Sequence, residues 1–265
     1  MSTKKYAVLG YPIHHSKSPL LHNASYRHLG LDGDYSNIEV RQGELSSFVE
    51  KSGSEFEAFS ITMPLKEEAF ALATTCDELS SSIGVANTLI QKSGEWIGSN
   101  TDILGFKEIL TRHFSSNLQN PVILGSGSTA KSALVALSKL GVTSIRMMAR
   151  NVTKVEHIGG LFPTLQIAYC PWGGEIHDAS IVISAVPEVS GVSFSSNVSQ
   201  FLDVTYSENR KYLIESIKAP QYSYRDGLNL LVYQAAHQVL QMRSVDESCY
   251  EEIVQVMFKA LGKEN

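Results

Sequence analysis

Cysteine, positive charge and long apolar runs are all in short supply in this sequence. The three cysteines, Cys76, Cys170 and Cys249, are scattered, and none belongs to a C-x-x-C pair. An odd, dispersed set of this kind forms neither a disulfide framework nor a cysteine metal site. A reducing compartment, the cytoplasm, is therefore the expected location.

The other two shortages exclude two classes of partner. The formal net charge is −5, whereas proteins that bind nucleic acid usually carry a basic patch. No apolar run approaches the roughly 18 residues that span a bilayer. The run at residues 6–9 is shorter than the apolar part of a signal peptide, which has about 7–15 residues. We therefore expect neither nucleic acid nor a membrane among the partners.

The chain does contain a regular alternation of strand-like runs and helix-length segments. In the second part the runs are continuously apolar, which is typical of a parallel sheet covered on both faces. Strands are expected at 6–9, 59–62, 86–91, 95–99, 122–124, 144–149, 181–185 and 201–204, with a hairpin turn at 92–94. Helices are expected at 104–114, 130–140 and 246–261. The fold class is therefore α/β, and a domain break is expected near 102–105.

One stretch, Gly10–Asn23, reads G-Y-P-I-H-H-S-K-S-P-L-L-H-N and connects the first strand to a helix. A simple connection, with Ser18 as N-cap and Pro19 at the first helical position, accounts for those two residues. It leaves Ser16 and the pair His22-Asn23 without a structural role. Hydroxyl and backbone N–H groups near a helix start suit a small anion such as a carboxylate.

A glycine-rich turn follows the strand at 122–124. Residues 121–130 read P-V-I-L-G-S-G-S-T-A and run directly into a helix. Gly125 and Gly127 let the backbone approach an anion, and free N–H groups point at it. Ala130 stands where alanine often replaces the third glycine of the dinucleotide-binding pattern. A purely structural turn is the alternative, but the strand–turn–helix context favours a dinucleotide.

The next strand distinguishes between two dinucleotides. NAD sites usually place Asp or Glu about 20 residues after the turn, to hold the ribose 2′-hydroxyl. Residues 146–151 read R-M-M-A-R-N and contain no acid. Arg150 has the guanidinium that pairs with a 2′-phosphate, and Thr153 and Lys154 add a hydroxyl and a second charge. A solvated basic strand end is the alternative, but the missing acid favours NADP.

Three polar segments of the first hundred residues carry ionisable or amide side chains. They are S-I-T-M-P-L-K at 60–66, A-N-T at 86–88 and N-T-D at 100–102. A lone lysine such as Lys66 is usually a solvated surface residue, and spacing alone does not show that the segments meet. Reduction of a ketone by NADPH nevertheless needs a proton donor for the developing alkoxide. An ammonium can supply that proton, and a carboxylate such as Asp102 can orient it.

Together these motifs resemble the shikimate dehydrogenases of aromatic amino-acid (chorismate) biosynthesis. The resemblance covers nearly the whole chain, through seven islands in the right order. They are the stretches at 10–23 and 60–66, I-G-V-A-N-T-L at 83–89, N-T-D at 100–102, L-G-S-G-S-T-A at 124–130, A-R-N at 149–151 and G-L-N-L-L-V-Y-Q-A at 227–235.

The resemblance implies an oxidoreductase that reversibly reduces 3-dehydroshikimate to shikimate with NADPH. It makes Lys66 and Asp102 the catalytic pair. The substrate-binding residues that it implies are Ser16, Ser18, Thr62, Asn87, Asn100, Tyr206 and Gln234. The cofactor-binding residues that it implies are Gly125, Ser126, Gly127, Ser128, Thr129, Ala130, Arg150, Asn151, Thr153, Lys154 and Gly227.

The resemblance also implies a domain arrangement. Residues 1–102 form an N-terminal α/β substrate-binding domain, which the C-terminal segment 233–265 completes. Residues 103–232 form a Rossmann-like NADP-binding domain with a parallel sheet.

Six positions depart from the family pattern, one of them the position after Tyr206, where the usual proline is missing. Ser128 and Ile103 replace glycines, Leu230 replaces a methionine, and Val186 and Glu188 lie in an altered S-A-V-P-E segment. The first-domain catalytic residues are all present, so activity is expected. Cofactor affinity and nicotinamide placement are the properties most open to change.

Two alternatives remain open. One is a related enzyme that also accepts quinate or uses NAD, although Arg150 argues against NAD. The other is a non-catalytic paralogue that only binds shikimate or NADP, although the presence of both catalytic residues argues against it. No metal ion is expected, because His14, His15 and His22 have no supporting cysteines or acidic cluster. A homodimer is one of the states that the sequence leaves open.

Overall fold

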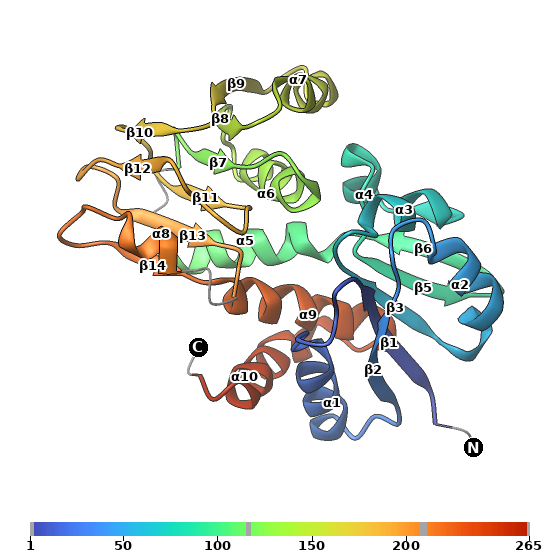
Figure 1. Ribbon diagram of the computed structural model, residues 1–265. Helices are drawn as coiled ribbons and strands as arrows, with labels where there is room; N and C mark the ends of the chain where they lie inside the picture. The colour runs from blue at the N-terminus through green and yellow to red at the C-terminus, as the bar shows by residue number, and fades with distance from the viewer. Residues whose placement is uncertain (1–2, 115–117, 207–210, 264–265) are drawn as a thin grey trace. The chain divides into compact units, whose positions relative to one another are not determined.

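The computed structural model of the chain describes residues 3–114, 118–206 and 211–263 (Figure 1). The chain divides into two compact units, residues 1–105 with 231–265 and residues 106–230. The boundaries fall inside two helices, α5 (Thr101–His113) and α9 (Gly227–Arg243). Helix α5 begins three residues before the expected position, because the Asn100 side chain accepts a hydrogen bond from the Asp102 N–H and caps it. The break therefore lies within a helix and not in a loop before one.

The first unit is built on a six-stranded mixed sheet in the order β2–β1–β3–β5–β6–β4. Its strands are β1 (Lys5–Gly10), β2 (Asp34–Glu39), β3 (Ala58–Ile61), β4 (Thr75–Cys76), β5 (Thr88–Lys92) and β6 (Glu95–Ser99). Its further helices are α1 (Ser18–His28), α2 (Leu45–Ser52), α3 (Lys66–Leu72), α4 (Glu78–Ile83) and α10 (Tyr250–Ala260), with short 3₁₀ turns at Gly53–Glu55 and Glu247–Cys249. Strand β5 runs antiparallel to β3 and β6, whereas β1 is parallel to β2 and β3.

Alternating side chains of the central strands decide which helices cover each face of this sheet. Leu9 and Phe59 point to one face, in a buried cluster that includes Leu45 at the start of α2. Tyr6, in the same strand as Leu9, and Ser60, next to Phe59, point to the other face, toward α1 and α9. Because side chains alternate along a strand, two apolar faces require two helical layers. The first unit is therefore a three-layer α/β/α arrangement.

The predicted hairpin is present as β5 and β6. The predicted strand at 95–99 is reproduced residue for residue, and the other strand begins at Thr88, two residues later than expected. Ser93 and Gly94 form the turn with φ of 53° and 87°. Two central residues with positive φ match the twist of the flanking strands, which explains the glycine.

The second unit is built on six parallel strands in the order β14–β13–β11–β7–β8–β9. They are β7 (Val122–Leu124), β8 (Ser144–Ala149), β9 (Gln166–Pro171), β11 (Val182–Ser184), β13 (Gln200–Asp203) and β14 (Ser223–Arg225). Helices α6 (Ser128–Lys139), α7 (Val152–Leu161) and α8 (Lys211–Glu215) accompany them, and β10 (Gly174–Ile176) pairs separately with β12 (Val192–Phe194). Counted along the chain, the sheet has the 3-2-1-4-5-6 order of a Rossmann fold. The predicted α/β class and Rossmann-like parallel sheet are confirmed.

No helix in the described part of the chain is long and apolar enough to cross a membrane.

Candidate active site

Four chain segments of the first unit meet at one edge of its sheet. Strands β1, β3 and β6 end at this edge and β5 begins there, because β5 alone among them is antiparallel. The segments after β1 and β3 are joined by a backbone hydrogen bond from Tyr11 N to Met63 O at 3.0 Å. This topology places Lys66, Asn87 and Asp102 at the same edge, although the sequence separates them.

The pair Lys66–Asp102 is a largely buried ion pair of the first unit. Lys66 Nζ lies 2.5 Å from Asp102 Oδ2, and the two side chains are only 12% and 9% exposed. Lys66 is the first residue of α3, and Asp102 lies in the first turn of α5, where the helix dipole favours a negative charge. Ion pairs on a protein surface contribute little to stability, whereas a buried pair loses much when one partner is removed. The lysine is therefore not the solvated surface residue that a lone lysine usually is.

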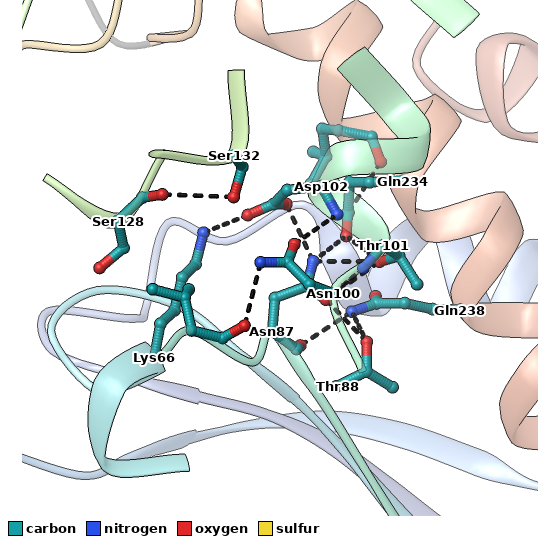
Figure 2. Close-up of polar contacts among 12 residues, drawn as sticks. Lys66, Asn87, Thr88, Asn100, Thr101, Asp102, Ser128, Ser132, Gln234 and Gln238 are labelled. Atoms are coloured by element: carbon teal, nitrogen blue, oxygen red, sulfur yellow. Dashed lines mark hydrogen bonds and ion pairs between the residues drawn. The ribbon is translucent and has the colours of Figure 1, made fainter. Parts of the chain in front are cut away.

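Asn87 holds the second carboxylate oxygen of Asp102 (Figure 2). Its Nδ2 donates to Asp102 Oδ1 at 2.9 Å, and its Oδ1 accepts from the Thr101 backbone N–H at 2.8 Å. Because a backbone N–H can only donate, the Asn87 amide has one orientation, with its NH₂ group toward the carboxylate. Asp102 is thus held by an ammonium on one oxygen and an amide on the other.

Asn100 and Gln234 complete this polar cluster. Asn100 donates from Nδ2 to the Val85 carbonyl at 3.1 Å and caps α5 with its Oδ1. Gln234 Oε1 accepts from Asn87 Nδ2 at 3.3 Å, which ties α9 to the cluster. The structure therefore brings together five of the predicted residues: Lys66, Asn87, Asn100, Asp102 and Gln234.

Ser16, Ser18 and Thr62 lie on the connections after β1 and β3. Ser16 Oγ accepts from the Ser18 N–H at 3.3 Å. A Cβ added to Gly10 would lie 2.4 Å from Thr62 Cγ2, so the two connections are in close contact and only glycine fits there. The hydroxyls of both connections thus belong to the same edge of the sheet as the ion pair.

Two expectations for the Gly10–Asn23 stretch are wrong. Lys17, not Ser18, is the N-cap of α1, because the helix begins one residue earlier than expected with Ser18 as its first residue. Asn23 does have a structural role, since its side chain exchanges hydrogen bonds of 2.8 and 3.0 Å with the Tyr35 backbone. His22 is also structural, for it is fully buried and stacks on Tyr35 with 4.0 Å between ring centroids.

The glycine-rich turn of the second unit forms the strand–turn–helix geometry of a phosphate cradle. Gly125 has φ of +108°, and a Cβ there would lie 2.9 Å from Val186 Cγ1. At Gly127 a Cβ would meet no described atom within 4 Å, so the space in front of the backbone is free. Ser126, Ser128 and Thr129 are half-buried on the turn and the first turn of α6, and Ala130 is fully buried. The backbone N–H groups at the start of α6 suit the phosphates of a dinucleotide.

The end of the neighbouring strand β8 carries exposed basic residues. Arg150 follows β8, and Lys154 lies on the first turn of α7 next to Thr153. Asn151 is the N-cap of α7, since its Oδ1 accepts from Lys154 N at 3.1 Å. An arginine and a lysine without an adjacent acid fit a 2′-phosphate better than a ribose hydroxyl.

Gly227 and Tyr206 lie on the carboxyl side of the sheet of the second unit. Gly227 begins α9, and a Cβ there would lie 2.1 Å from the Val204 carbonyl oxygen, so the close approach of two backbones requires glycine. This gives Gly227 a packing role, and its contact with the cofactor stays a prediction. Tyr206 follows β13 in the second unit, and burial raises its pKa. Its contact with the substrate stays a prediction.

Replacing Gly227 by alanine should destabilise the second unit by about 2 kcal/mol, the usual cost of forcing an extra carbon into a packed site. The matched control is Gly159→Ala in α7, where a Cβ would meet no described atom within 4 Å. That variant should be slightly stabilised, because alanine is the better helix former. Urea unfolding followed by circular dichroism measures both. Equal stability of the two variants would contradict the close approach.

The sequence does not predict the residues that contact Asn87 and Thr88 and so support the ion pair indirectly. Gln238 is 1% exposed and donates to the Asn87 carbonyl and to Thr88 Oγ1. Ser60, which is 4% exposed, donates to Gln238 Oε1. The signal in the sequence is weak but present: Gln238 lies four residues after Gln234, on the same face of a helix.

Fold and site together define an α/β protein with a Rossmann-type unit and a buried lysine–aspartate pair in a separate unit. Comparisons with known proteins agree with this class. A family model described as "Shikimate dehydrogenase substrate binding domain" matches residues 8–89. A "Shikimate dehydrogenase (NADP(+))" of Brucella abortus (strain S19) is 28% identical over 251 residues, which cover 88% of this chain and 86% of that protein.

Solved structures are also similar. The shikimate dehydrogenase of Mycobacterium tuberculosis is 30% identical, with a TM-score of 0.82, and the match covers 98% of this chain and 99% of that one. The 5-ketofructose reductase of Gluconobacter sp. strain CHM43 has a TM-score of 0.81 over 98% and 99% of the two chains, but at 23% identity it shows the fold alone. The chain belongs to the shikimate dehydrogenase family.

Proposed function

We propose that the chain catalyses the reversible NADP-dependent reduction of 3-dehydroshikimate to shikimate. The observation that carries the proposal is the buried Lys66–Asp102 ion pair, 2.5 Å apart at the edge of the sheet in the unit that the substrate-binding family model matches. A non-catalytic binding protein has no need of an ion pair held in this way. The reaction belongs to aromatic amino-acid (chorismate) biosynthesis.

The catalytic pair performs the proton transfer. The cofactor, when bound, supplies the hydride to the carbonyl carbon. The Lys66 ammonium stabilises the negative charge that develops on the carbonyl oxygen and donates the proton that converts it to a hydroxyl. Asp102 keeps the ammonium in place, because its two oxygens are fixed by Lys66 and Asn87. In the direction of shikimate oxidation, Lys66 takes that proton back.

Substrate recognition falls to the hydroxyl and amide groups around the pair. Ser16 and Ser18, which precede and begin α1, bind the substrate carboxylate together with backbone N–H groups at the start of that helix. Thr62, Asn87, Asn100 and Gln234 bind the ring hydroxyls, and Tyr206 is a further residue that we assign to the substrate.

The second unit holds NADP. The phosphate cradle comprises Gly125, Ser126, Gly127, Ser128, Thr129 and Ala130. Arg150, Asn151, Thr153 and Lys154 would hold the 2′-phosphate, and Gly227, at the start of α9, is assigned to the cofactor as well. We accordingly assign substrate binding to residues 1–102 with 233–265, and cofactor binding to residues 103–232.

Replacing Arg150 by alanine should raise KM for NADP about 10- to 100-fold, the size of a charge-assisted hydrogen bond. KM for NAD should change by less than about twofold, because NAD has no 2′-phosphate to lose. Arg150→Lys should recover part of the loss. Lys139→Ala is the matched control. Lys139 is the last residue of α6, at the end away from the phosphate cradle, so this variant should leave both KM values unchanged. Equal effects on NADP and NAD would refute the assignment.

The three cysteines are all free thiols, which supports a cytoplasmic location. A homodimer stays a prediction, which light scattering of the purified chain measures directly.

The proposal is tested by recording NADPH formation from shikimate, with parallel reactions on quinate and with NAD. Formation of NADPH from shikimate is the expected result. Faster turnover of quinate, or of NAD, would favour the enzyme of broader specificity. Reduction of 5-ketofructose in place of 3-dehydroshikimate would give the chain the activity that the Gluconobacter protein is named for. If no substrate reacts while shikimate still binds in calorimetry, the chain is a binding paralogue.

A further inference from the structure

The ion pair lies at the end of a longer chain of hydrogen bonds within the first unit. Tyr35 OH lies 2.5 Å from Ser60 Oγ, Ser60 Oγ lies 2.8 Å from Gln238 Oε1, and Gln238 Nε2 lies 3.0 Å from Thr88 Oγ1. Thr88 Oγ1 in turn lies 2.9 Å from Asn87 Oδ1, and Asn87 Nδ2 lies 2.9 Å from Asp102 Oδ1. Figure 2 shows the part from Gln238 to Asp102.

Two backbone groups fix the direction of every bond in this chain. The Asn87 carbonyl can only accept, so the end of the Gln238 side chain that faces it, at 3.1 Å, is the NH₂ group. The other end, Oε1, must accept from Ser60. Because the Ser60 hydroxyl has a single proton, Tyr35 must be the donor to Ser60. Burial raises the pKa of Tyr35, which keeps that hydroxyl protonated.

The same reasoning fixes the remaining bonds. The Thr101 N–H can only donate, so Asn87 presents its Oδ1 to Thr101 and Thr88 and its NH₂ group to Asp102. Each member from Tyr35 to Asn87 therefore donates toward the carboxylate. Hydrogen bonds in such a series polarise one another, so the dipoles of the whole series point their positive end at the Asp102 carboxylate.

We propose that Tyr35, Ser60 and Gln238 are positioning residues for the catalytic pair, acting through Thr88 and Asn87 on Asp102. They do not touch the substrate. The Thr101 N–H fixes the orientation of the Asn87 amide; the three residues support the amide in that place through Thr88, and the carboxylate that it donates to holds Lys66. The effect on turnover rests on the proposed dehydrogenase function, whereas the effect on the orientation of Asn87 does not.

Ser60 gives the sharpest test, because one variant removes only its hydroxyl, a second keeps the hydroxyl and adds a methyl group, and a third removes a hydroxyl that is equally buried elsewhere. Ser60→Ala removes the hydroxyl that joins Tyr35 to Gln238, and Ser60→Thr keeps it. Ser25→Ala removes a fully buried hydroxyl of α1 that donates to the Leu21 carbonyl and is not part of this series of hydrogen bonds. Ser60→Ala should lower kcat about tenfold, the size of one net hydrogen bond, and change KM for shikimate by less than about twofold. Ser60→Thr should recover most of kcat.

A second readout does not need activity. Amide hydrogen exchange at Thr101, whose N–H donates to Asn87 Oδ1 at 2.8 Å, should be faster in Ser60→Ala and unchanged in Ser25→Ala. Unchanged exchange in Ser60→Ala would overturn the proposal. Faster exchange in a chain that does not turn over shikimate would support the positioning role and refute the dehydrogenase instead. Equal losses of kcat in Ser60→Ala and Ser25→Ala would mean a purely structural role, and would also overturn the proposal.

Tyr35 and its neighbour Tyr26 provide a second matched pair. Both are almost fully buried, with ring centroids 6.5 Å apart. Among the described residues, the Tyr26 hydroxyl has no hydrogen-bond partner. Tyr35→Phe should lower kcat and speed exchange at Thr101, whereas Tyr26→Phe should change neither. The reverse order of the two effects would overturn the assignment of Tyr35.

A separate observation in the second unit concerns the arginine assigned to the 2′-phosphate. The Arg150 guanidinium carbon lies 5.1 Å from the centre of the Trp172 ring, in the range of a cation–π contact. The Trp172 ring is itself held, because its Nε1 donates to the Ser190 carbonyl at 3.0 Å. Trp172 follows β9, the strand beside β8, so both residues lie at the carboxyl end of the same sheet. Ligands of open α/β sheets bind at this end.

We infer that Trp172 is a positioning residue for Arg150 and contributes to selectivity for a 2′-phosphate; this inference rests on the proposed use of NADP. The chain has two tryptophans, so Trp96→Phe leaves Trp172 as the only tryptophan to follow by fluorescence. Adenosine 2′,5′-bisphosphate should then change its fluorescence, and 5′-AMP should not. Trp172→Leu, followed by calorimetry, should raise Kd for the bisphosphate about two- to fivefold, the size of an exposed cation–π contact. Trp172→Tyr should recover most of that loss.

The outcomes distinguish the role of Trp172 from the assignment of NADP as cofactor. Binding of the bisphosphate to the unaltered chain with equal Kd in Trp172→Leu would overturn the role of Trp172 alone. Failure of the unaltered chain to prefer the bisphosphate over 5′-AMP would overturn the NADP assignment and the role of Trp172 with it.

Discussion

Replacing Lys66 by alanine should lower kcat for shikimate oxidation by about two to four orders of magnitude, the usual range for loss of a general acid–base group. Lys66 is the group that transfers the proton at the edge of the sheet, and Asp102 is the partner that holds it in place. KM for shikimate should change much less, since the residues assigned to its carboxylate remain. Steady-state kinetics with NADP+ measures both constants. An unchanged kcat would remove Lys66 from the mechanism.

Two further variants separate catalysis from folding. Lys66→Ala leaves a buried carboxylate unpaired, which typically costs about 3–5 kcal/mol of stability. In the double variant Lys66→Met with Asp102→Asn, no charge is left unpaired, so stability should recover while activity does not. Lys5→Ala removes a lysine whose ion pair with Glu55, at 2.9 Å, has side chains more than half exposed. It should be close to the unaltered protein in both respects.

Three strands, β6, β7 and β8, are predicted with correct bounds. The residues of β7 are all buried, and the residues of β8 mostly so, and continuous apolar runs predict both strands with correct bounds. The edge strand β2 (D-Y-S-N-I-E) is not predicted, because only one of its six residues is buried and the rest are polar or half-exposed. Its order comes from pairing with β1, a contact that a local pattern does not contain.

The candidate site shows the same division between local and distant information. The glycine turn is local, and its strand–turn–helix geometry follows from ten consecutive residues. Lys66 and Asp102 are 36 residues apart, and no spacing rule predicts that they meet. Resemblance to a family supplies that pairing, but it does not supply Gln238, whose partners Ser60 and Thr88 are 178 and 150 residues away along the chain. Such residues become visible only when the sheet places their partners side by side.

Replacing His22 by leucine should abolish a large part of the acid sensitivity of the first unit. Burial lowers the pKa of His22 from 6.5 to about 3, and the Gln238 side chain opposes that shift. The ring packs against Tyr26 and Tyr35, and Gln238 is the polar side chain that favours its charged form. A charge at this site would be neither solvated nor paired, so the native state keeps the ring neutral.

The direction in which pH changes the stability follows from the pKa of His22 in the unfolded chain, 6.5, and in the native state, about 3. Above pH 6.5 the ring is neutral in both states and does not affect stability. Between pH 6.5 and about 3 the unfolded chain takes up a proton that the native state does not, so the free energy of unfolding falls by about 1.4 kcal/mol per pH unit. Over the whole window the loss is about 5 kcal/mol, the largest effect on stability expected for a single histidine here.

Urea unfolding between pH 4 and pH 8 measures this loss. A Trp172→Phe background leaves Trp96, in β6, to report on the first unit alone. His22→Leu should match the parent at pH 8 or exceed it, and should be about 3 kcal/mol more stable relative to the parent at pH 4, which is roughly 2.5 units below the unfolded pKa. His14→Gln, which changes an exposed histidine of the first unit, should follow the parent curve. If His22→Leu loses stability with falling pH as steeply as the parent does, the native ring accepts a proton in this window and is not sealed from water.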